Sequence, residues 1–272
     1  MTTLGTTTVK TLLLKSKIPG FDYTINPYVG CPHKCVYCYT EYMRKLSGHA
    51  EEWGDFLDVK ECPAPTHPAK LFHTRVMLSS VTDPYNRYEE QFRLTRNILT
   101  QLRFAQAEVC IYTKSPLVLR YMDLLKEMWK AEVCFSFSTA DETFRQLAEP
   151  GAPSLQERIN ALRVLHENNI PTAVMIAPIF PEITDWEKII HLTRPFTNRY
   201  AFDSLNMRPG YQKKVISFVE KNYPQHLPVY CDIYLEEKTA YWDNLAKKIK
   251  EVCQKHQIEP DICFQKNQPF MP

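Results

Sequence analysis

The chain has 272 residues, of which 44% are hydrophobic and 24% charged, and its formal net charge is +2. This length suits one large domain, the small net charge excludes a strong long-range attraction to polyanions, and no uncharged apolar stretch is long enough to span a membrane. The N-terminal residues lack the pattern of a secretory signal, so the nine cysteines are expected in a reducing, cytoplasmic compartment and in metal binding rather than disulfides.

The N-terminal part predicts one strand before the first motif. Residues 1–20 are expected to be an irregular lead-in, and residues 22–29 alternate in the manner of a strand. Gly30 then marks the start of a loop that is rich in cysteine.

Three cysteines follow within eight residues, at Cys31, Cys35 and Cys38, with the spacing C-x3-C-x2-C. Thiolates grouped this closely favour iron–sulfur, zinc or copper(I). Ferredoxin-type clusters and structural zinc sites both need a fourth ligand nearby, but the next cysteine is Cys62. One metal position is therefore expected to stay open, as it does in catalytic sites.

This spacing, with Tyr37 as an aromatic residue before the last cysteine, resembles the signature of the radical S-adenosylmethionine (SAM) superfamily. The resemblance implies a 4Fe-4S cluster on the three cysteines, SAM bound to the open iron, and Tyr37 beside these cofactors. One electron from the cluster would then cleave SAM to a 5′-deoxyadenosyl radical. A zinc knuckle is the alternative that the cysteine spacing leaves open.

Beyond the cysteines, a helix is expected at residues 39–46, with Gly48 as its stop signal. Residues 51–68 are first acidic and then rich in proline, and they are expected to form an insertion or lid with little regular structure.

The rest of the chain up to residue 223 repeats a short apolar run followed by a segment with helical periodicity. Including the first strand, the expected strands are 22–29, 75–80, 108–113, 132–138, 171–179 and 199–207. The expected helices after them are 88–104, 117–130, 155–168, 186–195 and 212–222. Alternation of this kind predicts an α/β fold with a parallel sheet, and the resemblance implies a partial (β/α)6 barrel of the TIM type, with which the six units agree.

The last part of the chain departs from the repeat. Residues 229–235 are expected as an edge strand and residues 236–256 as an amphipathic helix. We therefore expect residues 1–223 to form the partial barrel and residues 224–272 to form an extension that packs on it.

Polar residues follow the second and third strands, at the edge where parallel α/β folds place their chemistry. Thr82 and Asp83 stand where the resemblance implies contacts to the SAM ammonium group, and helix capping is the alternative. Lys114 would suit the SAM carboxylate, and a surface position is the alternative.

The fourth and fifth strands add further candidates. Ser136 and Ser138 share one face by the period of two, and they could bind the ribose or carboxylate of SAM or act as caps. Arg158 could pair with Glu149 or face the ligand. Ala177 lies in an apolar strand end that suits an adenine ring, unless it is plain core.

Several further blocks make residues 22–205 similar to the spore photoproduct lyase-like branch of the superfamily, often labelled "DNA repair photolyase". The blocks are residues 26–31, 79–85, 94–96, 113–120, 149–153 and 177–179. In true spore photoproduct lyases a cysteine that donates hydrogen precedes the Thr/Ser-Asp pair, but Ser80 stands at that place here. Because a serine O–H bond is a poor hydrogen-atom donor, repair of the spore lesion by that route is not expected. Cys110 or Cys134 could substitute, although buried strand cysteines are usually inert.

The sequence therefore predicts a radical SAM enzyme that abstracts hydrogen from a substrate that it does not identify, either a nucleic acid or a small molecule or peptide. The resemblance implies an electron donor such as flavodoxin or ferredoxin as a partner. A non-catalytic metal-binding or iron–sulfur protein is the alternative, and no membrane partner is expected.

Overall fold

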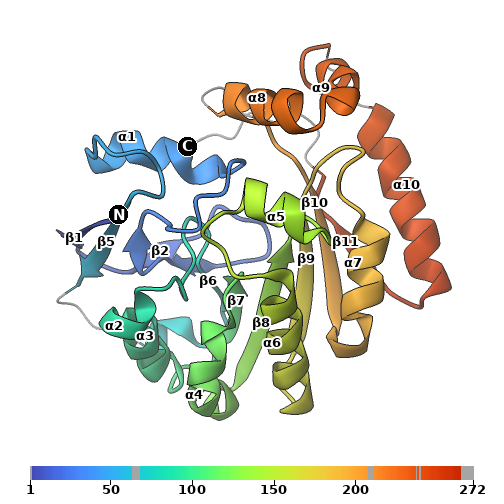
Figure 1. The fold of residues 1–272 in the computed structure, drawn as a ribbon. Helices are drawn as coiled ribbons and strands as arrows, with labels where there is room; N and C mark the ends of the chain where they lie inside the picture. The colour runs from blue at the N-terminus through green and yellow to red at the C-terminus, as the bar shows by residue number, and fades with distance from the viewer. Residues whose placement is uncertain (1, 63–67, 208–210, 237, 239, 265–272) are drawn as a thin grey trace.

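An eight-stranded sheet forms the centre of the computed structural model, which describes residues 2–62, 68–207, 211–236, 238 and 240–264 (Figure 1). Its strand order is β11-β10-β9-β8-β7-β6-β3-β2, and every neighbouring pair is parallel except β2–β3. The strands are β2 (Leu13–Lys15), β3 (Tyr23–Ile25), β6 (Arg75–Leu78), β7 (Glu108–Thr113), β8 (Lys130–Phe137), β9 (Thr172–Ile179), β10 (Arg199–Ser204) and β11 (Pro260–Ile262). Because β3 and β6 to β10 are the six predicted units, the partial (β/α)6 barrel is confirmed.

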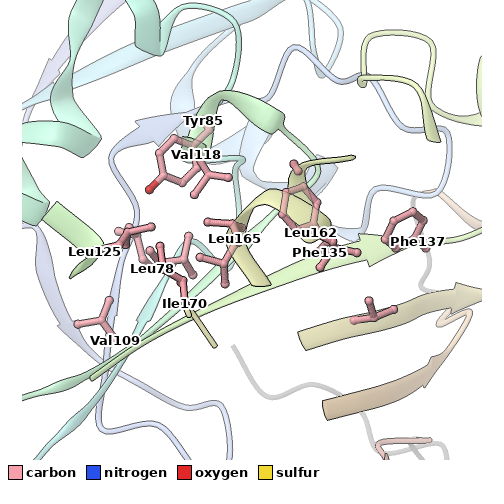
Figure 2. Close-up of a cluster of buried hydrophobic side chains, with 14 of the residues drawn as sticks. Leu78, Tyr85, Val109, Val118, Leu125, Phe135, Phe137, Leu162, Leu165 and Ile170 are labelled. Carbon is pink, nitrogen blue, oxygen red and sulfur yellow. The ribbon is translucent and has the colours of Figure 1, made fainter. Parts of the chain in front are cut away.

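Helices cover one face of this sheet, because each right-handed crossover returns the chain on the same side. These helices are α2 (Glu89–Phe92), α3 (Leu94–Leu102), α4 (Met122–Glu127), α6 (Leu155–Glu167) and α7 (Trp186–Thr193), with the short 3-10 helices η3 (Pro116–Tyr121) and η4 (Arg194–Phe196). Figure 2 shows Phe135 and Phe137 of β8 near Leu162 and Leu165 of α6, in the main hydrophobic core. Since side chains alternate along a strand, the residues between these core positions face the other side, the inner face of the barrel.

A second sheet of three strands corrects two expectations for the N-terminal part. It has the order β1 (Thr3–Thr8), β5 (Phe56–Glu61), β4 (Tyr28–Val29). The expectation of an irregular lead-in at residues 1–20 is wrong, because the threonine-rich β1 pairs in parallel with β5. The insertion is also more regular than predicted, because Phe56 and Leu57 of β5 are fully buried; its residues 63–67 lie outside the described residues. The predicted strand at 22–29 is divided, with β3 in the large sheet and β4 in the small one.

The predicted helices are mostly present, with shifted bounds. Residues 39–46 form η1 (Tyr39–Tyr42) and α1 (Met43–Ser47), which ends at the left-handed Gly48 as expected. The segment 88–104 is broken at Arg93, whose φ of 52° separates α2 from α3. The helix α5 (Glu142–Ala148) is not among the predicted helices, although its cap is visible in the sequence: the Asp141 side chain accepts a hydrogen bond from the Phe144 amide.

The C-terminal part contains α8 (Gln212–Asn222), η5 (Pro224–His226), α9 (Leu227–Tyr234) and α10 (Ala240–Lys255) before β11. The expectation of an edge strand at 229–235 is wrong, because a helix begins at Leu227 with Pro228 in its first turn, and Tyr230 is buried in a cluster with Val215 and Val219 of α8. β11 extends the large sheet beside β10, and Ile249 of α10 belongs to the main core. Among the described residues, none of the helices has the length and apolarity needed to cross a membrane.

Candidate cluster-binding site

The three cysteines lie on the loop of residues 30–38, which follows β4 and is enclosed between two other segments. Gly30 has a φ of 90°, and a Cβ at this position would lie 2.4 Å from the first carbonyl oxygen of β5. On the other side, a Cβ on Gly151 would lie 2.0 Å from the carbonyl oxygen of Pro32, and the Gly151 amide donates to the His33 carbonyl oxygen at 3.0 Å. Because only glycine permits such an approach, the backbone on both sides fixes the cysteine loop.

The thiols of Cys31, Cys35 and Cys38 are free and partly buried. Burial raises the pKa of Cys35 to about 12, and the carboxylate of Glu149 acts in the same direction. Burial also raises the pKa of Cys31, together with the charges of Asp83 and of the other two sulfurs. The three sulfurs are thus near enough to influence one another, and their protons must leave when a metal binds.

The donor set fits an iron–sulfur cluster. Three soft sulfur ligands within one short loop match its chemistry. No group of three His, Cys, Asp or Glu side chains in the described part of the chain could hold a single metal ion. A cluster does not need such convergence, because each thiolate binds a different iron atom.

Asp83 joins the cysteine loop to the ends of β6 and β7. Its carboxylate accepts hydrogen bonds from the backbone amide of Lys114 at 2.8 Å, from the Thr113 hydroxyl at 2.8 Å and from the Tyr85 amide at 2.9 Å. Its Oδ2 also lies 2.9 Å from Nε2 of His33. The other ring nitrogen of His33, Nδ1, lies 3.2 Å from the carbonyl oxygen of Gly151. Burial alone would raise the pKa of Asp83, but the charge of His33 and these hydrogen bonds outweigh it and lower the pKa.

Glu149 is the second buried carboxylate of the site. It accepts hydrogen bonds from the Tyr37 hydroxyl, from Nη2 of Arg158 and, at 2.7 Å, from the Ser138 hydroxyl. Nζ of Lys114 lies 3.9 Å from its Oε1. Burial alone would raise the pKa of Glu149, but the charges of Arg158 and Lys114 outweigh burial and lower it to about 2. Glu149 therefore stays ionised, and it draws four of the predicted site residues together.

The pair of Glu149 with Arg158 is one of the two alternatives that the sequence leaves open. Arg158 is fully buried, and its guanidinium also donates to the carbonyl oxygens of Pro153 at 2.9 Å and Ser136 at 3.1 Å. It has no exposed surface with which to meet a ligand directly.

The remaining predicted residues lie at the same edge of the sheet. The Thr82 hydroxyl donates to the Gly30 carbonyl oxygen at 2.6 Å, which ties the end of β6 to the cysteine loop. Ser136 and Ala177 are partly buried, at the ends of β8 and β9. By the alternation along their strands, both face the inner side of the barrel.

The inner face also carries Cys110 and Cys134, which were considered above as hydrogen donors, together with Tyr112 and Asp203. Cys110 and Tyr112 in β7 and Cys134 in β8 alternate with core residues, and Tyr112 is directly opposite Cys134 in the register. Asp203, near the end of β10, lies at an irregularity in the pairing with β9. Its Oδ1 accepts the Ser204 amide at 2.8 Å, and burial raises its pKa to about 7.

Sequence reasoning missed two residues that contact the cysteine loop, His33 and Trp53, and one that holds the segment after β6, Asn26. His33 stands within the cysteine motif itself, which was the signal available. The side-chain oxygen of Asn26 accepts hydrogen bonds from the backbone amides of Ser80 and Val81, at 2.8 and 3.0 Å. The indole N–H of Trp53 donates to Sγ of Cys38 at 3.2 Å, and no local pattern marks it.

Comparison with known proteins identifies a family and relatives that match between 62% and 91% of the chain. The model of the family described as the radical SAM superfamily matches residues 25–193. An uncharacterized protein of Methanocaldococcus jannaschii is 37% identical over 248 residues, which cover 91% of this chain and 92% of that protein. An uncharacterized protein of Mycobacterium tuberculosis is 28% identical over 185 residues, which cover 62% of this chain and 54% of its own length.

Solved structures share the fold at low sequence identity. Spore photoproduct lyase complexed with dinucleoside spore photoproduct has a TM-score of 0.54 and 18% identity, and the match covers 82% of this chain and 66% of that one. SuiB of Streptococcus suis bound to the precursor peptide SuiA has a TM-score of 0.56 and 14% identity, with 89% and 48% covered. The chain thus spans slightly less than two thirds of the lyase and about half of SuiB.

Proposed function

The chain belongs to the radical SAM superfamily, and from this premise we propose that Cys31, Cys35 and Cys38 hold a 4Fe-4S cluster at which SAM is bound and cleaved. When bound, the cluster would supply the electron that cleaves SAM to methionine and a 5′-deoxyadenosyl radical, and this radical would abstract hydrogen from a substrate on the inner face of the barrel. The observation that carries the proposal is the cysteine loop, held by Asp83 and Glu149 at the carboxyl edge of a parallel sheet.

In this proposal the buried residues position the groups that meet the cofactors. Asp83 places the cysteine loop through His33, since both of its oxygens are engaged within the protein. Glu149, fixed by Arg158, orients the ring of Tyr37, which packs edge-on against Phe180 at 5.6 Å. These two carboxylates act at a distance from SAM.

The groups left to contact SAM are those with free surface at the strand ends. Nζ of Lys114 lies 5.8 Å from the centre of the Tyr37 ring and is only loosely paired with Glu149, so it is suited to the SAM carboxylate. Ser136 supplies a hydroxyl, and Ala177 an apolar edge, for the nucleoside part of SAM. The hydroxyl of Ser138 already donates to Glu149, so Ser138 is assigned to positioning Glu149. Thr82 can still accept a hydrogen bond while it donates to the loop.

We further propose that the substrate is a small molecule or a peptide and that the lesion repaired by spore photoproduct lyase is not the substrate. Ser80 takes the place of the hydrogen-donor cysteine. Its backbone is fixed by two hydrogen bonds, because its amide donates to the Asn26 side chain and its carbonyl oxygen accepts from the Tyr39 hydroxyl. A nucleic acid remains the second candidate, because one structural neighbour was solved with a dinucleoside lesion.

The test is anaerobic reconstitution with iron and sulfide, followed by measurement of 5′-deoxyadenosine formed from SAM with dithionite or a flavodoxin as reductant. Cys35→Ala should lose the cluster and the product, because one iron then lacks its protein ligand. Cys231→Ala is the matched control, since Cys231 is also partly buried but lies on α9. Full iron content and product in Cys35→Ala would refute the ligand assignment, and a wild-type chain that binds zinc in place of iron would favour a non-catalytic metal protein.

A further inference from the structure

Two polar groups lie within hydrogen-bond distance of the sulfur of Cys38. The indole Nε1 of Trp53 lies 3.2 Å from Sγ, and the hydroxyl of Thr40 lies 2.9 Å from it. An indole N–H can only donate. A thiolate bound to iron has no proton, so in the cluster-bound protein the hydroxyl must donate as well.

Trp53 comes from the insertion, which is firmly placed against the cysteine loop. A Cβ on Gly54, whose φ is 96°, would lie 3.2 Å from the Cys31 carbonyl oxygen, and Asp55 forms an ion pair with Lys34. The chain then enters β5, which pairs with β4 immediately before the loop. The insertion and the loop are therefore joined by backbone pairing and by close contact.

The indole is also fixed by its own packing. Its side chain is 4% exposed and meets Phe56 edge-on, with 5.6 Å between the ring centres. The ring of Phe56 also stacks on that of His49, with 3.8 Å between the ring centres, and Nε2 of His49 lies 2.9 Å from Oδ2 of Asp58 in β5. A donor held this rigidly keeps its direction when the charge on the sulfur changes.

We propose that Trp53 and Thr40 set the reduction potential of the cluster by donating hydrogen bonds to the Cys38 thiolate, which makes the insertion part of the redox site. Hydrogen bonds to cluster sulfurs are one of the factors that fix this potential. Reduction adds negative charge that the sulfurs share, so the donors stabilise the reduced form more than the oxidised form. The inference rests on the proposed function only in requiring that the three cysteines bind a cluster.

The experiment is a potentiometric titration of the reconstituted protein, followed by EPR, without SAM or substrate. Trp53→Phe keeps an aromatic ring but removes the N–H, so the midpoint potential should become more negative. Thr40→Val should shift the potential in the same direction, and Thr40→Ser should leave it near the wild-type value. Trp129→Phe is the control, because Trp129 is half exposed and immediately precedes β8, at the opposite end of the strands.

The outcomes separate this inference from the proposed function. A wild-type chain that forms no cluster defeats the proposed function and the inference with it. A cluster in Trp53→Phe with an unchanged potential overturns the inference alone. If Trp53→Phe binds no iron, the two variants of Thr40 decide. A more negative potential in Thr40→Val, with a wild-type potential in Thr40→Ser, supports the inference. Equal potentials in Thr40→Val and Thr40→Ser overturn it.

Discussion

At the scale of single residues, Asp203 differs from the other buried carboxylates of the site. Asp83 lies beside His33 and accepts three further hydrogen bonds, Glu149 lies beside Arg158 and Lys114, and the pKa values of both carboxylates are lowered. Within the described part of the chain, Asp203 has only the backbone donor of Ser204, and burial raises its pKa to about 7. Two of these carboxylates therefore stabilise the fold as anions, whereas the ionised form of Asp203 destabilises it.

This contrast predicts a stability effect with a definite sign. The folded-state pKa of Asp203 lies above its unfolded value, so its contribution to stability is present at low pH and is lost as the pH rises towards about 7. Asp203→Asn cannot ionise, so its free energy of unfolding should rise relative to wild type between pH 5 and pH 8, by up to about 2–3 kcal/mol. Urea unfolding of the cluster-free protein at the two pH values measures this difference.

The control for this measurement is Asp243→Asn, since Asp243 is exposed in the first turn of α10. Its difference from wild type should be the same at both pH values. An Asp203→Asn protein that loses stability relative to wild type as the pH rises would show that Asp203 has a cationic partner.

The sequence marks the candidate site residues that belong to short patterns and misses those whose position depends on folding. Cys31 and its two partners follow from spacing alone, and Lys114 follows from its place at a strand end. Trp53 could not be found in this way, because its target lies 15 positions earlier and is reached only when β5 pairs with β4. Asp203 looks like an ordinary strand residue in the sequence, because only the fold shows that it faces the inner side of the barrel and that burial governs its pKa.

At the scale of elements, the segment from α5 to Gly151 holds the cysteine loop from one side. The last residue of α5, Ala148, accepts the Val36 amide at 2.9 Å, and Gly151 bonds to His33. This element was missing from the sequence prediction because it is short, although its N-cap Asp141 and the apolar Phe144 were visible. The misassigned α9 is the opposite case, since its aromatic and β-branched residues favour a strand and packing against α8 overrides them.

The close contact at Gly151 predicts a loss of metal binding without loss of the fold. A methyl group in Gly151→Ala would meet the Pro32 carbonyl oxygen at 2.0 Å, so the cysteine loop must move away. We expect iron bound after reconstitution to fall severalfold, with a cost in stability of about 1–3 kcal/mol. Iron and sulfide analysis, together with urea unfolding, measures both effects.

Gly48→Ala is a matched control for this steric effect. Gly48 has a φ of 75° and no atom within 4 Å of an added Cβ, so alanine there is strained but meets nothing. It should lose about 1–2 kcal/mol and keep its iron. Equal iron content in the two variants would mean that the cysteine loop does not depend on the approach of Gly151.

At the scale of the whole molecule, the charges of the inner face are largely balanced. Towards the amino ends of the strands, Arg75 pairs with Glu108, and Arg199 pairs with both Glu132 and Asp261. The electrostatic potential at the inner face is therefore only weakly attractive to phosphates, in agreement with the net charge of +2. This balance is the physical basis for preferring a small molecule or a peptide as the substrate.

The last prediction follows from this balance. Proteins that neutralise 6–10 phosphates lose about 10³–10⁵ in affinity between 50 and 200 mM salt. For this chain, reconstituted with its cluster and SAM, we expect binding of a fluorescent DNA duplex to be weak at the lower salt and to fall less than about tenfold over that range, because paired arginines release few counterions. Fluorescence anisotropy measures the slope, and Arg199→Ala should leave it unchanged, since that guanidinium is already neutralised by Glu132 and Asp261. Tight binding with a steep slope, reduced by Arg199→Ala, would instead place a phosphate backbone on the inner face and make a nucleic acid the substrate.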